Sequence, residues 1–148
     1  MILNEDYKEM LLCLSEENVR FLLIGAYALG AYGHLRATMD IDIWVKPSPE
    51  NAQAVLKALR RFGAPLHGIT IPDLISDDTV FQIGVAPRRI DILTGASGLR
   101  FDETWERAVV VNLDGLAVRI PSIPDLIRNK RASGRAKDLA DVGVLESM

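Results

Sequence analysis

The sequence has little of what secreted, thiolate-metal or membrane proteins depend on. It contains one cysteine, Cys13, which excludes a disulfide framework or a cysteine-based metal cluster and which we expect in the core. Only two histidines are present, which disfavours a structural zinc site. No apolar run reaches the about 18 residues of a membrane span, and the start of the chain lacks the pattern of a secretory signal. The default prediction is a cytoplasmic protein without membrane contact.

Excess positive charge is also missing. The chain carries 17 Lys and Arg against 20 Asp and Glu, a net charge of −3. This balance excludes coating of nucleic acid through bulk charge and leaves only a local basic stripe. What is present is apolar: hydrophobic residues make up 49% of 148 positions, enough for the core of one domain. We expect a single domain over residues 1–148, with its core at about 19–120 and a C-terminal helical segment at about 122–147.

Hydrophobic periodicity and turn residues predict a mixture of helices and strands. The predicted helices span residues 4–17, 26–32, 50–62, 124–133 and 136–146. The predicted strands span residues 19–24, 39–45, 79–85, 88–93, 108–112 and 116–120. Residues 63–78 look irregular, and an Asp-Gly pair predicts the turn of a hairpin near residue 114. This order indicates an α/β (α+β) fold with helices on at least one side of a sheet.

The most informative segment is the Asp-Ile-Asp-Ile run at residues 40–43. Alternation along a strand places Asp40 and Asp42 on the same face, with carboxylates about 6.6 Å apart. Two carboxylates beside an apolar core repel each other unless a cation or a shared proton lies between them. Oxygen-only ligands favour Mg²⁺. The alternative is a pair of ordinary acids on a solvent-facing edge.

A third carboxylate and a glycine turn add to this pattern. Asp91 lies in a second alternating apolar run and is the candidate to complete a metal site. Alternatively, Arg88 or Arg89 pairs with it at the surface. Gly25 ends an apolar run and opens a helix, where exposed backbone amides bind phosphate, although a plain helix-entry turn has the same pattern.

Two polar residues lie between the glycine turn and the paired aspartates. Arg36 and Thr38 offer a guanidinium and a hydroxyl that would reach triphosphate oxygens. The alternatives are a solvated arginine and a structural threonine. His34 and His67 are isolated, which favours loop or packing roles. Trp44 shares the face of the aspartates, where it either packs in the core or stacks on a base.

Four blocks of sequence resemble the minimal nucleotidyltransferases of the DNA polymerase β superfamily, which include antibiotic adenylyltransferases and the nucleotidyltransferase-like toxins of toxin–antitoxin systems. The blocks are LLIGAYAL, HLRATMDIDIWV, RRIDILT and KRASGRAKDLAD. The resemblance implies a polymerase β-like fold, a mixed sheet flanked by helices with C-terminal helices. It also implies that Asp40 and Asp42 bind Mg²⁺, that Asp91 completes the site as a base, and that Gly25 opens the phosphate loop.

The last block resembles the tail of the toxin-like branch. That resemblance implies that Lys130 and Lys137 face the nucleotide or the substrate. Without it, the basic run is a solvated helix face, and Asp138 and Asp141 pair with its cations. One position departs from the family, which usually has Gly or Ser where this chain has Ala26. Alanine keeps the backbone amide for phosphate but removes a hydroxyl donor.

The implied reaction moves a nucleoside monophosphate from a nucleoside triphosphate to a hydroxyl and releases pyrophosphate. The acceptor is a small molecule, an RNA end or a protein side chain, and the protein partner is an antitoxin if the chain is a toxin. One alternative is a catalytically inactive nucleotide-binding module of a two-protein assembly. Another is an inert scaffold that retains only the fold.

Overall fold

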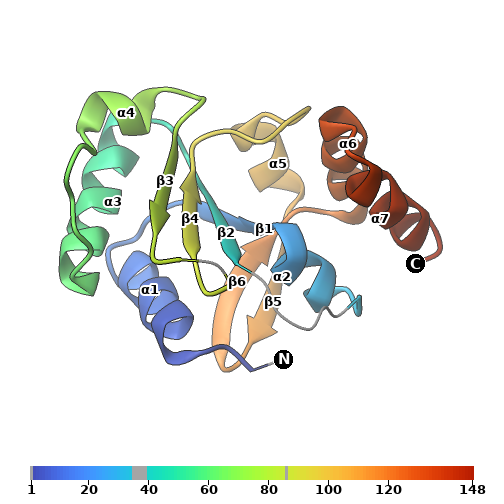
Figure 1. Cartoon of the computed structure of the whole chain (residues 1–148), viewed down its shortest axis with the longest axis horizontal. Helices are drawn as coiled ribbons and strands as arrows, with labels where there is room; N and C mark the ends of the chain where they lie inside the picture. The colour runs from blue at the N-terminus through green and yellow to red at the C-terminus, as the bar shows by residue number, and fades with distance from the viewer. Residues whose placement is uncertain (1, 35–39, 86) are drawn as a thin grey trace.

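The computed structural model describes residues 2–34, 40–85 and 87–148, and these form seven helices and six strands (Figure 1). The helices are α1 (Glu5–Glu16), α2 (Gly25–Ala31), α3 (Pro49–Phe62), α4 (Ile71–Ile75), α5 (Phe101–Arg107), α6 (Ile123–Ser133) and α7 (Ala136–Glu146). The strands are β1 (Phe21–Ile24), β2 (Ile41–Val45), β3 (Val80–Ile83), β4 (Ile90–Leu93), β5 (Val109–Leu113) and β6 (Leu116–Ile120). No helix in these described ranges has the length and apolar character needed to cross a membrane.

Four strands form a mixed sheet in the order β1-β2-β4-β3. β2 pairs in parallel with β4, while β1 and β3 run antiparallel to their neighbours at the two edges. The two central strands are largely buried, because residues in the middle of a covered sheet are shielded on both faces. The strands predicted at 79–85 and 88–93 correspond to β3 and β4, which pair as an antiparallel hairpin.

The two faces of this sheet have different cover. One face packs against α1 and α3 and includes Ile41 and Ile43, which are fully buried. The opposite face carries Trp44, which makes an edge contact with Phe101 of α5 at a ring distance of 5.2 Å. In Figure 1, α1, α3 and α4 lie on one side of the sheet and α5, α6 and α7 on the other. Since α5 covers only part of its face, the rest remains open to a cavity.

Local signals explain the elements that the sequence predicted well. The Asn4 side chain accepts a hydrogen bond from the Tyr7 N–H at 2.8 Å and starts α1, which buries Cys13 as predicted. The β5–β6 hairpin turns at Asp114 and Gly115, both with positive φ, as the Asp-Gly pair indicated. Ser122 caps α6, and the break before α7 lies where it was predicted.

The prediction missed two short helices. α4 lies in the segment 63–78 that was expected to be irregular, and Thr70 and Asp73 form a capping box at its start. α5 was not predicted at all. Both are too short to show a helical period, and α5 is held by Phe101 packing on the sheet, a contact that only the tertiary structure reveals.

Candidate functional site

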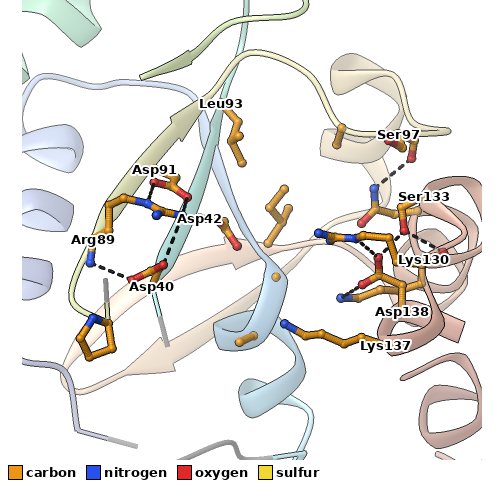
Figure 2. Close-up of a pocket in the computed structure, with 17 residues that line it drawn as sticks. Asp40, Asp42, Arg89, Asp91, Leu93, Ser97, Lys130, Ser133, Lys137 and Asp138 are labelled. Carbon is orange, nitrogen blue, oxygen red and sulfur yellow. Dashed lines mark hydrogen bonds and ion pairs between the residues drawn. The ribbon is translucent and has the colours of Figure 1, made fainter. Parts of the chain in front are cut away.

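A cavity of about 590 Å³ lies between the open part of the sheet and the two C-terminal helices (Figure 2). The wall on the sheet side is acidic and carries Asp40, Asp42 and Asp91. The opposite wall, on α6 and α7, carries the cationic side chains Lys130, Arg135 and Lys137. The structure therefore brings residues from distant parts of the chain to one cavity with two oppositely charged walls.

The acidic wall follows from strand register. Asp42 on β2 is directly paired with Asp91 on β4, and in a parallel pair such partners point to the same face. Asp40 immediately precedes β2 and lies on the same side, as Figure 2 shows. Asp91 is only 6% exposed, so it is not part of a solvent-facing edge. The three carboxylates of the sequence hypothesis thus line one cavity.

Positive charge near this wall would offset the repulsion among its carboxylates. Burial raises the pKa of Asp42 from its ordinary 3.8 to about 6, and the neighbouring Asp91 and then Asp40 add to the rise. Lys130, across the cavity, acts in the opposite direction. A cation placed among the carboxylates would favour their ionised forms, because it offsets both the burial and the mutual repulsion.

Arg89 supplies the positive charge that the described residues place there. Its Nε donates to Asp91 Oδ1 at 2.7 Å and its Nη2 to Asp91 Oδ2 at 3.1 Å. The same Nη2 lies 3.3 Å from Asp40 Oδ2 (Figure 2). The pairing of Asp91 with Arg89 that the sequence left open is present, but it lies inside the cavity and not at an exposed surface.

The donor set fits a hard divalent cation by its chemistry, because it consists of carboxylate oxygens on two adjacent strands. Arg89 lies between Asp40 and Asp91, whose oxygens are turned toward its guanidinium. In the described part of the chain, no three His, Cys, Asp or Glu side chains are already grouped as a metal site. The three candidate ligands thus lie on one wall, and a metal would require Asp40 and Asp91 to turn from Arg89.

Gly25 is packed directly against the acidic wall. It opens α2 with φ +68°, and a Cβ at this position would overlap Asp42 Oδ2. Only glycine combines that backbone angle with so close an approach. Gly25 and Ala26 both line the cavity, which places the turn between β1 and α2 beside the carboxylates.

The basic wall is built on a buried ion pair network. Lys130 is 7% exposed, and its Nζ lies 3.2 Å from Asp138 Oδ1 and 3.2 Å from Asp141 Oδ2. Ser133 and Arg135 also donate to Asp138, at 2.6 and 2.7 Å. Burial alone would raise the pKa of Asp138, but these three donors outweigh it and lower the pKa to about 2. The acids of the tail therefore pair with its cations and position Lys130.

Lys137 differs from Lys130 in its surroundings. Its side chain extends from α7 into the cavity, toward α2, as Figure 2 shows. Trp44 lies in the core, at 1% exposure and in contact with Phe101, and not at a base-stacking position. Arg36 and Thr38, the two remaining candidates from the sequence, lie outside the described residues.

Sequence reasoning missed several polar residues of the cavity. Ser133 lies three residues after Lys130 on α6, so helical spacing was a signal that could have found it, and Asn129 lies one turn before Ser133. Ser97 follows β4 in an irregular segment, and its carbonyl accepts a hydrogen bond from Asn129 Nδ2 at 2.9 Å. No local pattern marks Ser97, because only the docking of α6 brings it to the site.

The mixed sheet, the acidic wall on its central strands and the C-terminal helices define the nucleotidyltransferase class, in agreement with the fold predicted from the sequence. A family model described as "Nucleotidyltransferase of unknown function (DUF6036)" matches residues 1–146, and the chain belongs to this family. Among proteins with curated functions, none matches the sequence.

Two solved structures share the fold. The lincomycin-bound lincosamide antibiotic adenylyltransferase LnuA is 16% identical, with a TM-score of 0.62 over 99% of this chain and 98% of that chain. The antibiotic-resistance factor ANT(2'')-Ia, in a solution structure, is 15% identical, with a TM-score of 0.60 over 95% of this chain and 80% of that chain. At such identities the likeness establishes the fold and not a shared substrate.

Proposed function

We propose that the protein transfers a nucleoside monophosphate from a nucleoside triphosphate to a hydroxyl acceptor. The observation that carries this proposal is the pairing of Asp42 with Asp91 across two parallel strands, beside Asp40, on a cavity whose far wall is cationic. An acidic wall can hold the metal that such a reaction uses, and a cationic wall attracts a triphosphate.

Asp40, Asp42 and Asp91 would hold a divalent cation, and their oxygen-only donors match Mg²⁺. When bound, the ion supplies charge neutralisation on the triphosphate and activation of the acceptor hydroxyl. Asp91 has a second role, because its carboxylate would accept the proton of that hydroxyl. Its depth in the cavity keeps this proton transfer away from bulk water.

The triphosphate would lie between the two walls. The backbone amides of Gly25 and Ala26 would donate to phosphate oxygens next to the carboxylates. Lys137 would contribute a mobile charge, while Lys130 would contribute a fixed one, because its ammonium is held by Asp138 and Asp141. The cavity of about 590 Å³ falls in the range of small-molecule sites, roughly 300–1,000 Å³.

The acceptor remains one of three kinds: a small hydroxylated molecule, an RNA end or a protein side chain. The similar fold of LnuA, solved with lincomycin bound, supports a small molecule. The resemblance of the tail to nucleotidyltransferase-like toxins supports a macromolecule, with an antitoxin as partner. A cytoplasmic location, where nucleoside triphosphates are made, is part of the proposal.

A second candidate is a nucleotide-binding module without turnover. The observation that favours it is the contact of Arg89 with both Asp91 oxygens, because the guanidinium then competes with an acceptor hydroxyl for those oxygens. The two candidates share nucleotide binding and differ in transfer.

Incubation of the protein and Mg²⁺ with each of the four α-labelled triphosphates and with RNA, protein and lincosamide acceptors tests the proposal. We expect label on one acceptor class and loss of labelling in Asp42→Asn. Equal labelling by the variant would contradict the site. A rise in melting temperature with Mg²⁺ and triphosphate, but no labelling of any acceptor, would favour the inactive module.

A further inference from the structure

Arg89 occupies the position among the carboxylates that the proposed reaction needs free. Its guanidinium makes a two-point contact with Asp91, at 2.7 and 3.1 Å, and reaches Asp40 Oδ2 at 3.3 Å (Figure 2). Its backbone N–H also donates to Asp40 Oδ1 at 2.9 Å. Both oxygens of Asp91 and both oxygens of Asp40 therefore face this one residue.

The backbone of Arg89 is fixed while its side chain is not enclosed. Its carbonyl accepts hydrogen bonds from the Tyr7 hydroxyl at 3.2 Å and from the Ile41 N–H at 3.0 Å, which attach it to α1 and to the start of β2. The side chain is 29% exposed. The backbone of Arg89 is thus held by α1 and the sheet, whereas its guanidinium can turn toward solvent or into the cavity.

A guanidinium and a divalent cation would both offset the negative charge of this acidic wall. Asp42 and Asp91 are neighbours on paired strands, and positive charge beside them relieves their repulsion. A carboxylate that accepts both N–H groups of an arginine fork keeps further lone pairs, but the guanidinium offsets its charge and fills the space on the side that it contacts. The two cations therefore compete for the same carboxylates, by charge and by space.

We propose that Arg89 is a positioning residue that holds Asp40 and Asp91 together as an internal counter-cation in the metal-free protein, and that it leaves Asp91 when a divalent cation binds. This inference rests on the proposed function, because it assumes that the acidic wall is the metal site. It assigns to Arg89 control over metal affinity, which neither the fold nor the carboxylates alone imply.

The chain offers a matched control for this residue. Arg88 is the preceding residue, is exposed and has no ion pair with the three carboxylates among the described contacts. Arg88→Ala removes the same charge one residue away from the fork. Arg89→Lys keeps the charge at position 89 but replaces the planar fork by a single ammonium, so it separates the effect of the fork from that of charge.

The experiment measures Mn²⁺ binding by calorimetry, and melting in excess chelator, for the unaltered protein and the three variants. We expect Arg89→Ala to bind Mn²⁺ about three- to tenfold more tightly and to melt several degrees lower without metal, with the melting gap closing at saturating Mn²⁺. Arg89→Lys should bind more tightly than the unaltered protein, by less than the alanine variant. Arg88→Ala should match the unaltered protein in both measurements.

The outcomes distinguish this inference from the function it rests on. Equal or weaker Mn²⁺ binding by Arg89→Ala would overturn the inference while leaving the metal site intact. Absence of Mn²⁺ binding by the unaltered protein and every variant would overturn the proposed function as well. If Arg89→Ala does not fold in chelator, Arg89→Lys decides, since binding no tighter than that of the unaltered protein would contradict competition by the fork.

Discussion

Gly25 links the backbone conformation at the start of α2 to the position of the Asp42 carboxylate. It has a left-handed conformation at φ +68° and its Cα lies against the carboxylate of Asp42. A larger residue would meet two separate obstacles, one in the backbone and one in Asp42. The sequence identified Gly25 from its place at the end of an apolar run, but the contact with Asp42 depends on the antiparallel pairing of β1 and β2.

We expect Gly25→Ala to lower the free energy of unfolding by about 2–4 kcal/mol, because a backbone penalty and a steric overlap add. Nucleotidyl transfer should be lost, since Asp42 is displaced. Gly63→Ala is the control: Gly63 has φ +88° but nothing within 4 Å of the added Cβ. It should cost about 1–2 kcal/mol and leave transfer intact. Urea unfolding and labelled transfer would check both, and similar losses of transfer in the two variants would contradict the role of Gly25.

The contact between α6 and α7 likewise links the packing of the chain to the position of a site residue. The two helices pack against each other, and their buried contact contains charges, not only apolar side chains: Lys130 lies between Asp138 and Asp141. A buried cation is tolerated only when it is paired. The basic wall of the cavity therefore depends on the acids of α7 that hold Lys130 in place.

We expect Asp138→Asn to destabilise the protein by about 2–4 kcal/mol at neutral pH, because Lys130 then remains buried with one fewer partner. Glu146→Gln, which breaks the exposed pair with Arg131, should change stability by less than about 1 kcal/mol. Because the folded pKa of Asp138 is lowered to about 2, its contribution is present above about pH 4 and is lost as the pH falls toward 2. Urea unfolding from pH 2.5 to 7 measures this, and equal losses in the two variants would contradict it.

Elements that begin and end with local chemistry were predictable, while those held by tertiary contacts were not. The Asn4 cap, the Asp-Gly turn and the Ser122 cap each satisfy backbone groups within a few residues. α5 has no such signal at its start, because Arg100 makes no side-chain cap there. In the candidate site, alternation gave the faces of Asp40 and Asp42, but the fork of Arg89 and the burial of Lys130 follow only from packed neighbours.

In the protein as a whole, the acidic and basic walls of the cavity make the free energy of unfolding depend on pH in opposite directions. In the basic wall, Lys130 is paired with the acids of α7, whereas in the acidic wall Asp42 keeps a raised pKa of about 6. The folded, metal-free protein therefore holds a proton on Asp42 at pH values where the unfolded chain has released it.

Such a group contributes stability below the unfolded pKa of about 3.8, and the contribution is lost as the pH rises through about 6. In chelator, we expect the contribution of Asp42 to fall by about 2–3 kcal/mol from pH 4 to pH 7.5. Asp42→Asn should lack this component, and saturating Mn²⁺ should reduce it because metal favours the ionised form. Unfolding by urea across this range provides the measurement, and an Asp42→Asn profile parallel to that of the unaltered protein would be the contrary result.

The parallel pairing of β2 with β4 also determines on which face of the sheet Asp91 lies. A slip of one residue between these strands would turn Asp91 into the layer under α1 and α3, and would bring Ile90 or Ile92 out in its place. Such a misaligned sheet would lose its apolar interior and its reactive group in a single step. We therefore expect substitutions that loosen this alignment to impair folding and the site together.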